Sequence, residues 1–416
     1  MNLNLSYNPQ PITRNPQLKI TGSKSETNRL LLLQALYPNI TLENTSNSDD
    51  SEVMIQALQN SQPATRNPQQ IDVHHAGTAM RFLAAFFAIQ EGREVILTGS
   101  PRMKERPIKI LVEALNQLGA EITYEENDGF PPIRIKGKKI IKNKVSLPAN
   151  VSSQYISALL LVAPKLENGL ELTLEGEITS IPYINMTLAL LNEIGVKTSF
   201  NGNKIAICHA ELVSASHILV ESDWSSASYW YSIIALSEIG TQITLSSYKE
   251  NSLQGDAALV EIYKSFGVET VFNNNQSITL SKNRNPQLAT FNSQLNNSPD
   301  IAQTIAVTCF GLGIGCHLNG LHTLKIKETD RLEALKTELS KLGATISVTN
   351  DSLTLESSKS IIPSINIATY QDHRMAMAFA PLALKVPITI QEAEVVSKSY
   401  PAFWDDLQGF GFHFSE

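Results

Sequence analysis

Cysteine is scarce in this chain of 416 residues, and the scarcity excludes two kinds of architecture. The three cysteines, Cys208, Cys309 and Cys316, form no CxxC pair. So few thiols argue against a disulfide framework, and the lack of a CxxC pair argues against a thiolate metal site, so we expect core thiols instead. The eight histidines show no HExxH or comparable spacing, so no metal centre is expected either.

Long apolar runs and a strong positive charge are also missing. No stretch of about 18 apolar residues could cross a membrane, and the N-terminus lacks the cationic and then apolar layout of a signal peptide. The formal net charge of -7 argues against general nucleic-acid binding. We therefore expect a cytoplasmic protein without membrane or nucleic-acid partners, in which any anion site is a local concentration of lysine and arginine.

A repeated pattern organises the chain: an amphipathic helix, then a glycine, then a strand. A glycine suits that place because it adopts the left-handed conformation that ends a helix. A helix predicted over 49–60 adds a sixth copy, and strands are predicted over 94–97, 170–174 and 241–245. A chain of this length is expected to form two domains, so three α/β units in each are predicted. The glycines, roughly 70 residues apart, are Gly119, Gly195, Gly267, Gly343 and Gly411.

The segment 327–331, Lys-Glu-Thr-Asp-Arg, sets cations and carboxylates together at the start of a predicted helix. Asp330 is placed to cap this helix, and leucines at helical spacing follow as far as Gly343. A helix N-terminus attracts anions, and Lys327 and Arg331 strengthen that field while Glu328 adds a titratable group to it. Taken alone, the segment is explained equally well as an exposed capping run.

Other cations also lie at or near predicted helix starts, where each opposes the helix dipole. Each one alone is explained by an ordinary cap or a basic loop. Together, drawn from both halves of the chain, they indicate helix N-termini that converge on strongly anionic ligands. Besides Arg331, the cations are Lys24, Arg29, Arg81, Arg106, Lys327, Arg374 and Lys398.

One neutral residue and one acidic residue also lie at predicted helix starts. Thr78 is predicted to cap an apolar helix that runs to about Ile89, and Asp300 precedes another apolar helix. Capping is the commoner role for such an aspartate.

The segment 22–29 is similar to half of a phosphate loop, but Ser23 stands where a Walker A loop needs glycine, so a P-loop NTPase is not expected.

Ten segments, in order along the chain, resemble the 5-enolpyruvylshikimate-3-phosphate synthase family. The resemblance implies an α/β (α+β) fold of two similar domains, each of three βαβαββ-type units, with the active-site cleft between them. It implies that residues 1–22 join 221–416 in one domain and that 23–220 form the other. The segments are 22–32, 75–85, 97–108, 151–155, 182–188, 223–230, 299–300, 325–332, 369–379 and 398–404.

The resemblance also implies the reaction. The carboxyvinyl group of phosphoenolpyruvate would pass to the 5-hydroxyl of shikimate 3-phosphate with release of phosphate, in aromatic amino acid (chorismate) biosynthesis. No metal or organic cofactor is implied, and we expect a monomer. In the catalytic roles, Asp300 would be the base for the hydroxyl, Glu328 would transfer the proton at the methylene carbon, and Lys24 would assist.

The family pattern assigns the substrate contacts residue by residue. Shikimate 3-phosphate would be bound by Lys24, Ser25, Arg29, Ser152, Ser153, Gln154, Ser180, Tyr183, Asp300 and Lys327. Phosphoenolpyruvate would be bound by Lys24, Gly77, Arg106, Gln154, Arg331, Arg374 and Lys398. The chain departs from the pattern at His75, where asparagine is common, and at Phe82, where proline is common. Thr323 falls where one branch of the family has a substrate-binding asparagine.

Two alternatives remain at this point. The sister enzyme UDP-N-acetylglucosamine enolpyruvyl transferase shares the implied fold but typically carries a reactive cysteine in the loop at 101–107, where this chain has none. A non-catalytic anion-binding relative would share the cations. Binding of anions alone would not favour carboxylates such as Asp300 and Glu328 among those cations, so this second alternative is disfavoured.

Overall fold

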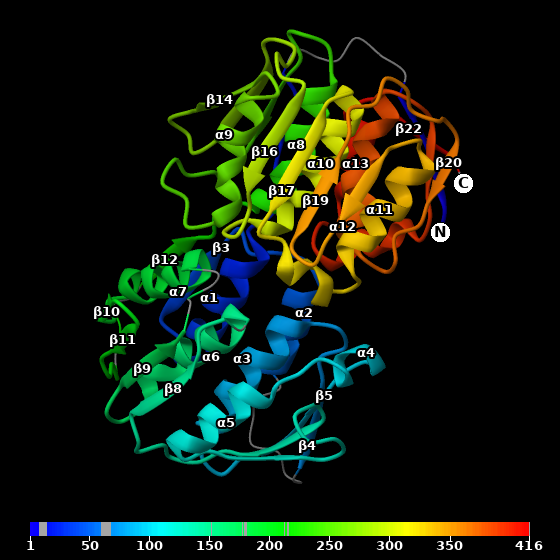
Figure 1. Cartoon of the computed structure of the whole chain (residues 1–416). Coiled ribbons are helices and arrows are strands. Elements are labelled where there is room, and N and C mark those ends of the chain that lie inside the picture. The colour runs from blue at the N-terminus through cyan, green and yellow to red at the C-terminus, as the bar shows by residue number, and fades with distance from the viewer. Residues whose placement is uncertain are drawn as a thin grey trace. The chain divides into compact units, whose positions relative to one another are not determined.

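The computed structural model of the chain describes residues 1–7, 15–59, 68–150, 152–176, 178, 181–211, 213 and 216–415. These residues form two compact units. Unit 1 comprises residues 1–22 and 221–416, and unit 2 comprises residues 23–220. Figure 1 shows both chain ends beside strands of unit 1. No helix among the described residues is long and apolar enough to span a membrane.

One sheet pattern recurs in the described part of unit 1. Its clearest copy is the sheet β16-β17-β19-β18 (Figure 1), in which β16 and β17 are parallel and the other neighbours are antiparallel. Helix α10 (Ala302–Leu312) joins the parallel strands, and α11 (Arg331–Lys341) leads to the hairpin. This is a βαβαββ unit, as predicted. Its strands are β16 (Thr290–Gln294), β17 (Gly315–Asn319), β18 (Ile346–Val348) and β19 (Ser352–Leu355).

The other two four-stranded sheets described in unit 1 repeat this order, and both borrow a strand from the N-terminal segment. Strand β2 (Gln17–Leu18) adds to β13 (Gln242–Leu245), β14 (Val268–Phe272) and β15 (Ile278–Lys282), with helices α8 (Trp224–Leu236) and α9 (Leu259–Lys264). Strand β1 (Leu3–Tyr7) adds to β20 (Ile365–Ile367), β21 (Ile388–Ile390) and β22 (Phe412–Ser415), with helices α12 (His373–Phe379) and α13 (Phe403–Gly409). The N-terminal segment therefore completes two repeats of unit 1.

Unit 2 contains two complete sheets of the same pattern within its described residues. One holds β4 (Gln69–Asp72), β5 (Glu94–Thr98), β6 (Glu121–Tyr124) and β7 (Ile133–Lys136), with helices α3 (Gly77–Ala88), α4 (Pro101–Lys104) and α5 (Lys109–Leu118). The other holds β8 (Lys144–Pro148), β9 (Leu170–Glu175), β10 (Thr198–Asn201) and β11 (Lys204–Ile207), with helices α6 (Ser153–Val162) and α7 (Ile181–Glu193). The strands predicted over 94–97, 170–174 and 241–245 are thereby confirmed.

The sixth repeat is abbreviated in the described residues. Strands β3 (Ile40–Glu43) and β12 (Ser216–Leu219) pair in parallel as a two-stranded sheet, with helices α1 (Lys24–Leu36) and α2 (Asp49–Gln59). The chain passes from α2 toward β4 of the next repeat, and residues 60–67 between them lie outside the described residues. The predicted helix over 49–60 is confirmed, but its hairpin is not among the described strands.

One helix from each repeat lies in the centre of its unit. In unit 1, α8 packs against α10, and α10 packs against α12. In unit 2, α3 packs against both α1 and α6. Helices α3, α6, α8 and α10 are buried on nearly every side, so they lack the amphipathic periodicity of a surface helix. Hydrogen bonds join helix starts from distant segments: Arg374 at the start of α12 donates to Ser225 of α8, and Gln154 at the start of α6 donates to Thr78 of α3.

The five predicted glycines all follow or end helices with positive φ, which confirms the repeat. Gly119 has a φ of 115° and Gly343 has a φ of 98°, both in the left-handed region. At Gly267 a Cβ atom would lie 1.9 Å from the carbonyl oxygen of Arg284, so glycine is required there for space as well.

Four local predictions were wrong. Ala76, not Thr78, occupies the N-cap of α3. Asp300 lies inside the short 3-10 helix Pro299–Ile301, and Ser298 precedes it, because the Asp300 carboxylate faces arginines instead of backbone N–H groups. Lys398 ends the 3-10 helix Ala393–Lys398, where a cation favours the helix dipole. Cys208 is exposed, whereas Cys309 and Cys316 are buried as predicted.

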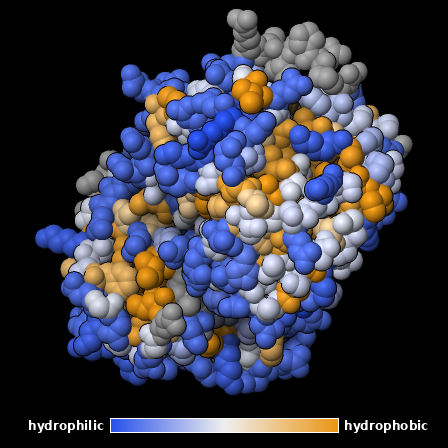
Figure 2. Space-filling view, turned by 45° about the horizontal axis from the view of Figure 1, so that its top comes forward, coloured by the Kyte–Doolittle hydropathy of each residue, from blue (hydrophilic) through white to orange (hydrophobic). Residues whose placement is uncertain are grey.

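The face in Figure 2 is largely hydrophilic and is interrupted by separate apolar patches. Isolated exposed apolar residues are normal on proteins and need no functional explanation. Among the described residues, the large exposed ones include Ile141, Ile181, Ile239, Val271, Ile326 and Ile362.

Candidate active site

Arg331 is the centre of a buried ion network in unit 1. It is the first residue of α11, whose cap is Asp330, as predicted: the Asp330 carboxylate accepts from the N–H groups of Leu332 and Glu333, each at 3.2 Å. The Arg331 side chain is only 2% exposed. Its guanidinium therefore requires compensation inside the protein. That compensation comes from three carboxylates, two of which lie on other segments of the chain.

Each nitrogen of the Arg331 guanidinium donates to a carboxylate. Nε donates to Asp372 Oδ2 at 2.6 Å, Nη1 to Asp300 Oδ1 at 2.8 Å, and Nη2 to Glu328 Oε2 at 2.7 Å. Burial alone would lower the pKa of Arg331, but these carboxylates raise it above its ordinary value. The structure thus brings together the residues predicted as base and as proton-transfer group, Asp300 and Glu328, on one guanidinium.

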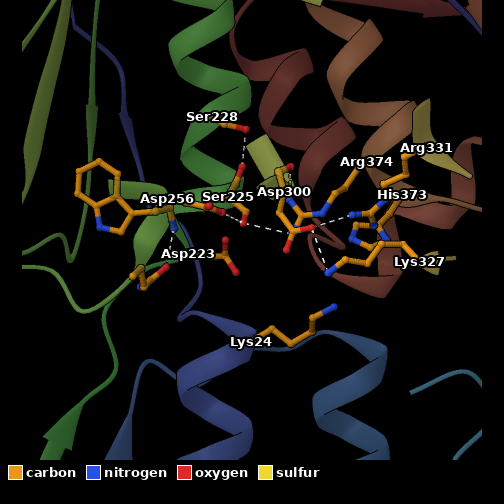
Figure 3. Close-up of polar contacts among 12 residues, drawn as sticks. Lys24, Asp223, Ser225, Ser228, Asp256, Asp300, Lys327, Arg331, His373 and Arg374 are labelled. Carbon is orange, nitrogen blue, oxygen red and sulfur yellow. Dashed lines mark hydrogen bonds and ion pairs between the residues drawn. The ribbon is translucent and has the colours of Figure 1, made fainter. Parts of the chain in front are cut away.

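Asp300 is surrounded by cations (Figure 3). Besides Arg331, Lys327 Nζ lies 3.4 Å from its Oδ1 and Arg374 Nη2 lies 3.6 Å from its Oδ2. Burial raises the pKa of such a carboxyl, but Lys327, Arg374 and Arg331 outweigh burial and hold the pKa of Asp300 well below its usual range. In this state Asp300 is a firmly ionised carboxylate.

Arg374 connects α12 with α8 and with Asp300. Its Nη1 donates to the Asp300 carbonyl oxygen at 3.1 Å, and its Nη2 donates to Ser225 Oγ at 3.3 Å. Asp372 caps α12 by accepting from the Arg374 N–H at 2.9 Å, so one carboxylate holds both Arg331 and the start of α12. Lys398 contacts the segment that precedes α12. Its Nζ donates to the Gln371 carbonyl oxygen at 2.7 Å.

Three further acidic residues of this cluster were not predicted as site residues: Asp223, Asp256 and Asp372. Asp223 caps α8, and its Oδ1 accepts from the Ser226 N–H at 3.0 Å. Burial and the nearby Asp300 raise the pKa of Asp256 to about 6. Asp223 and Asp372 stand directly before apolar helices, which is the signal that could have identified them. Asp256 lies in a 3-10 helix, Gly255–Ala258, and carries no such signal.

In unit 2, Arg29 is buried and tied to protein acceptors. Its Nε donates to Thr187 Oγ1 at 2.8 Å, its Nη2 to Ser157 Oγ at 2.9 Å, and its Nη1 to the Ser25 carbonyl oxygen at 2.7 Å. Its guanidinium also lies over the rings of Phe82 and Tyr183, at 5.4 and 5.8 Å. Burial lowers the pKa of Arg29 to about 10, so it remains charged at neutral pH.

Gly77 and Arg106 are matched to each other. Gly77 begins α3, and a Cβ atom there would lie 2.7 Å from both terminal nitrogens of Arg106. Only a residue without a side chain lets the guanidinium lie over this helix start. Arg81 supports the same region, because its Nη2 donates to the Pro107 carbonyl oxygen at 2.8 Å. Burial and the neighbouring Arg106 lower the pKa of Arg81 to about 10.

The starts of α6 and α1 supply the other predicted residues of unit 2. Ser152 caps α6, and Gln154 Nε2 donates to Thr78 Oγ1 on α3 at 3.1 Å. Lys24, the first residue of α1, has its Nζ 3.4 Å from Asp50 Oδ2. His75 approaches the same carboxylate, with Nε2 3.8 Å from Asp50 Oδ1. Ser153 begins α6, while the predicted Ser180 lies outside the described residues.

The departures from the family pattern have structural correlates. His75 borders an open cavity of about 330 Å³, whose lining residues include Asp49, Asp50, His74 and Ser100. Phe82 lies against Arg29 instead of being exposed to the cavity. The Thr323 hydroxyl has no hydrogen-bond partner within the described residues. The histidines, cysteines and carboxylates of those residues form no group of three or more suited to a metal ion.

Comparison with known proteins identifies the family. A family model described as EPSP synthase (3-phosphoshikimate 1-carboxyvinyltransferase) matches residues 43–407. The chain is 45% identical over 399 residues to a 3-phosphoshikimate 1-carboxyvinyltransferase of Bacteroides fragilis strain YCH46, covering 95% of each. It is 35% identical over 417 residues to the same-named protein of Colwellia psychrerythraea strain 34H, covering 94% of this chain and 96% of that one. In fold it is similar to an EPSP synthase structure from Acinetobacter baumannii, with a TM-score of 0.80, 20% identity and full coverage of both chains. The chain therefore belongs to the EPSP synthase (3-phosphoshikimate 1-carboxyvinyltransferase) family.

Proposed function

We propose that this chain is a 3-phosphoshikimate 1-carboxyvinyltransferase. It transfers the carboxyvinyl group of phosphoenolpyruvate to the 5-hydroxyl of shikimate 3-phosphate and releases phosphate. The observation that carries the proposal is that one buried guanidinium, Arg331, holds both Asp300 and Glu328. A site for anions alone gains nothing from carboxylates, whereas this reaction needs a base and a proton-transfer group among anion-binding cations.

The two substrates bring phosphate and carboxylate groups, which match the cations at the helix starts. Arginine binds such groups with paired hydrogen bonds, and helix N-termini add a favourable field. We assign phosphoenolpyruvate to Lys24, Gly77, Arg106, Gln154, Arg331, Arg374 and Lys398. We assign shikimate 3-phosphate to Lys24, Ser25, Arg29, Ser152, Ser153, Gln154, Ser180, Tyr183, Asp300 and Lys327.

The proposed chemistry is addition followed by elimination. The 5-oxygen forms a bond to C2 of phosphoenolpyruvate while Asp300 accepts the hydroxyl proton and Glu328 gives a proton to C3. The bond from C2 to the phosphate oxygen then breaks, C3 loses a proton to Glu328, and the enol ether is complete. Lys24 assists by stabilising the negative charge on the departing phosphate.

The ion network explains how Asp300 becomes a base. In the ligand-free chain the cations hold the pKa of Asp300 well below its usual range, which suits an ion-pair partner but not a base. Phosphoenolpyruvate accepts hydrogen bonds from Arg331 and Arg374, and its negative charge then offsets theirs. The field on Asp300 weakens, so its pKa rises toward the range in which it can accept a proton.

The wider setting follows from the same assignment. We propose that the chain acts in aromatic amino acid (chorismate) biosynthesis, as a cytoplasmic monomer that uses small-molecule substrates without a cofactor. The family match supports the assignment to this pathway.

A phosphate-release assay tests the proposed function. We expect release only when phosphoenolpyruvate and shikimate 3-phosphate are both present. Release with UDP-N-acetylglucosamine in place of shikimate 3-phosphate would indicate the sister enzyme, and no release with either acceptor would indicate a non-catalytic relative.

A further inference from the structure

Ser225 occupies an unusual position at the start of α8. Of the thirteen residues of this helix, all of which the structure describes, Ser225 is the one that is not buried. The helix already has a cap, because Asp223 Oδ1 accepts from the Ser226 N–H. Ser225 is therefore required neither for the core nor for the capping of α8.

The Ser225 hydroxyl joins two other elements of unit 1 (Figure 3). It donates to Asp256 Oδ2 of the 3-10 helix Gly255–Ala258 and accepts from Arg374 Nη2 of α12 at 3.3 Å. Asp256 is 6% exposed, and its Oδ2 is directed at the hydroxyl. The result is a chain of hydrogen bonds from Asp256 through Ser225 to Arg374, which in turn donates to Asp300.

We propose that Ser225 and Asp256 are positioning residues that fix the direction of the Arg374 guanidinium toward phosphoenolpyruvate. The proposal rests on the function proposed above. Neither residue touches the reacting atoms, and both act through Arg374.

The hydrogen-bond partners of the Ser225 hydroxyl determine which way it points. A serine hydroxyl has one proton and can rotate, so by itself it does not present a fixed acceptor. Asp256 accepts the proton and thereby turns the oxygen lone pairs toward Arg374. Ser228 holds the same turn, because its Oγ donates to the Ser225 carbonyl oxygen at 2.6 Å. An arginine held at one edge presents its remaining N–H groups in a fixed direction, which suits paired recognition of a carboxylate or phosphate.

The charges around Asp256 make the hydrogen bonds from Asp256 through Ser225 to Arg374 sensitive to pH. Asp300, Asp223 and Arg374 face Asp256 from three other segments, and burial with Asp300 raises its pKa to about 6. Below that pH, Asp256 is neutral and accepts the Ser225 proton more weakly. The positioning of Arg374 then weakens as well.

The test is steady-state kinetics of full-length variants with both substrates. For Ser225→Ala and Asp256→Asn we expect the KM for phosphoenolpyruvate to rise about 10-fold or more, the loss typical of a hydrogen bond to a charged group. The KM for shikimate 3-phosphate stays within about twofold, because the altered guanidinium contacts the other substrate. Ser225→Thr, which keeps the hydroxyl, restores most of the affinity. Ser232→Ala is the matched control, since Ser232 is a buried serine of the same helix that accepts from Thr308 Oγ1 at 2.8 Å.

A pH series separates positioning from a loss of structure. The ratio of the phosphoenolpyruvate KM of Asp256→Asn to that of the wild type is expected to be largest near pH 8 and to approach one below pH 6, where wild-type Asp256 is itself neutral. Equal increases in both KM values, no rescue by Ser225→Thr, or a ratio independent of pH would overturn the proposal. If Ser225→Ala does not fold, the near-isosteric Asp256→Asn decides. A wild-type chain without turnover would overturn the proposed function and this inference together, whereas an active wild type with unaltered variants would overturn the inference alone.

Discussion

Arg331 Nη1 donates to Asp300 Oδ1 across 2.8 Å, and so ties the start of α11 to the segment before α10. The two residues are proposed to serve different substrates: Arg331 binds phosphoenolpyruvate, and Asp300 contacts shikimate 3-phosphate. In the ligand-free chain each neutralises the other, because either ion buried alone would be costly. Substrate binding must therefore exchange this internal pair for contacts with the ligand, which couples occupancy of the site to the basicity of Asp300.

Glu328→Gln tests the proton-transfer group. Glutamine keeps the size and can still accept from Arg331, but it cannot give and take back a proton at C3. We expect kcat to fall about 10²- to 10⁴-fold, the usual contribution of a general acid or base, with little change in substrate affinity. Stopped-flow or steady-state phosphate release measures this. Glu333→Gln, an exposed neighbour paired with Lys336, is the control, and equal kcat values for the two variants would remove Glu328 from the mechanism.

Gly77→Ala tests the match between Gly77 and Arg106. The added methyl group would lie 2.7 Å from the terminal nitrogens of Arg106, so the guanidinium has to move. We expect the KM for phosphoenolpyruvate to rise about 10-fold or more through the loss of charged hydrogen bonds, while the KM for shikimate 3-phosphate changes little. The melting temperature should hardly change, because the displaced group is the mobile end of a side chain. Gly409→Ala, where a Cβ meets nothing within 4 Å, should alter neither constant. A KM for phosphoenolpyruvate in Gly77→Ala equal to that of the wild type would contradict the match between Gly77 and Arg106.

Asp372→Asn tests the stability of the ion network. The Asp372 side chain is fully buried and accepts from Arg331 Nε at 2.6 Å and Nη2 at 3.4 Å. Asparagine preserves the cap of α12 but leaves the buried guanidinium short of one negative charge. The free energy of unfolding in urea should fall by about 3–5 kcal/mol. Asp330→Asn, the same change at the partly exposed cap of α11, should cost less than about 1 kcal/mol. Similar losses in the two variants would show that the Asp372 charge does not stabilise the protein through its pairing with Arg331.

Asp256→Asn tests the effect of burial on that carboxyl. Its pKa is raised from 3.8 to about 6, so the folded chain binds this proton more tightly than the unfolded chain. Well below pH 4 the group is neutral in both states, and well above pH 6 it is ionised in both, with the folded state penalised. Relative to the variant, the wild type should therefore lose about 2 kcal/mol of stability as the pH rises from 4 to 7. Urea unfolding of both proteins across this range measures the difference, and a constant difference would contradict the raised pKa.

Much of the fold could be predicted because helix ends leave local marks in the sequence. The glycines such as Gly119 and Gly343 adopt positive φ, and Asp330 caps α11, as expected from short-range chemistry. The abbreviated repeat at β3 and β12 could not be predicted, because strands separated by more than 170 residues pair there without a local signal.

Several residues of the ion network around Arg331 could be singled out from the sequence, but their contacts could not. Lys327, Glu328 and Arg331 are adjacent in sequence, so their proximity required no tertiary knowledge. Asp372 and Asp256 were missed because their importance comes from what they meet across the fold. The wrong capping assignment of Asp300 has the same cause, since a carboxylate near a helix start can turn toward arginines that lie far away in sequence.

The most direct test of the proposed reaction is proton NMR of the products formed in deuterium oxide from phosphoenolpyruvate and shikimate 3-phosphate. If C3 is protonated and then deprotonated, the product is an enol ether at the 5-oxygen whose methylene carbon carries deuterium, and one phosphate is released per ether formed. Phosphate released without an ether, or an ether whose methylene carbon carries no deuterium, would contradict the account.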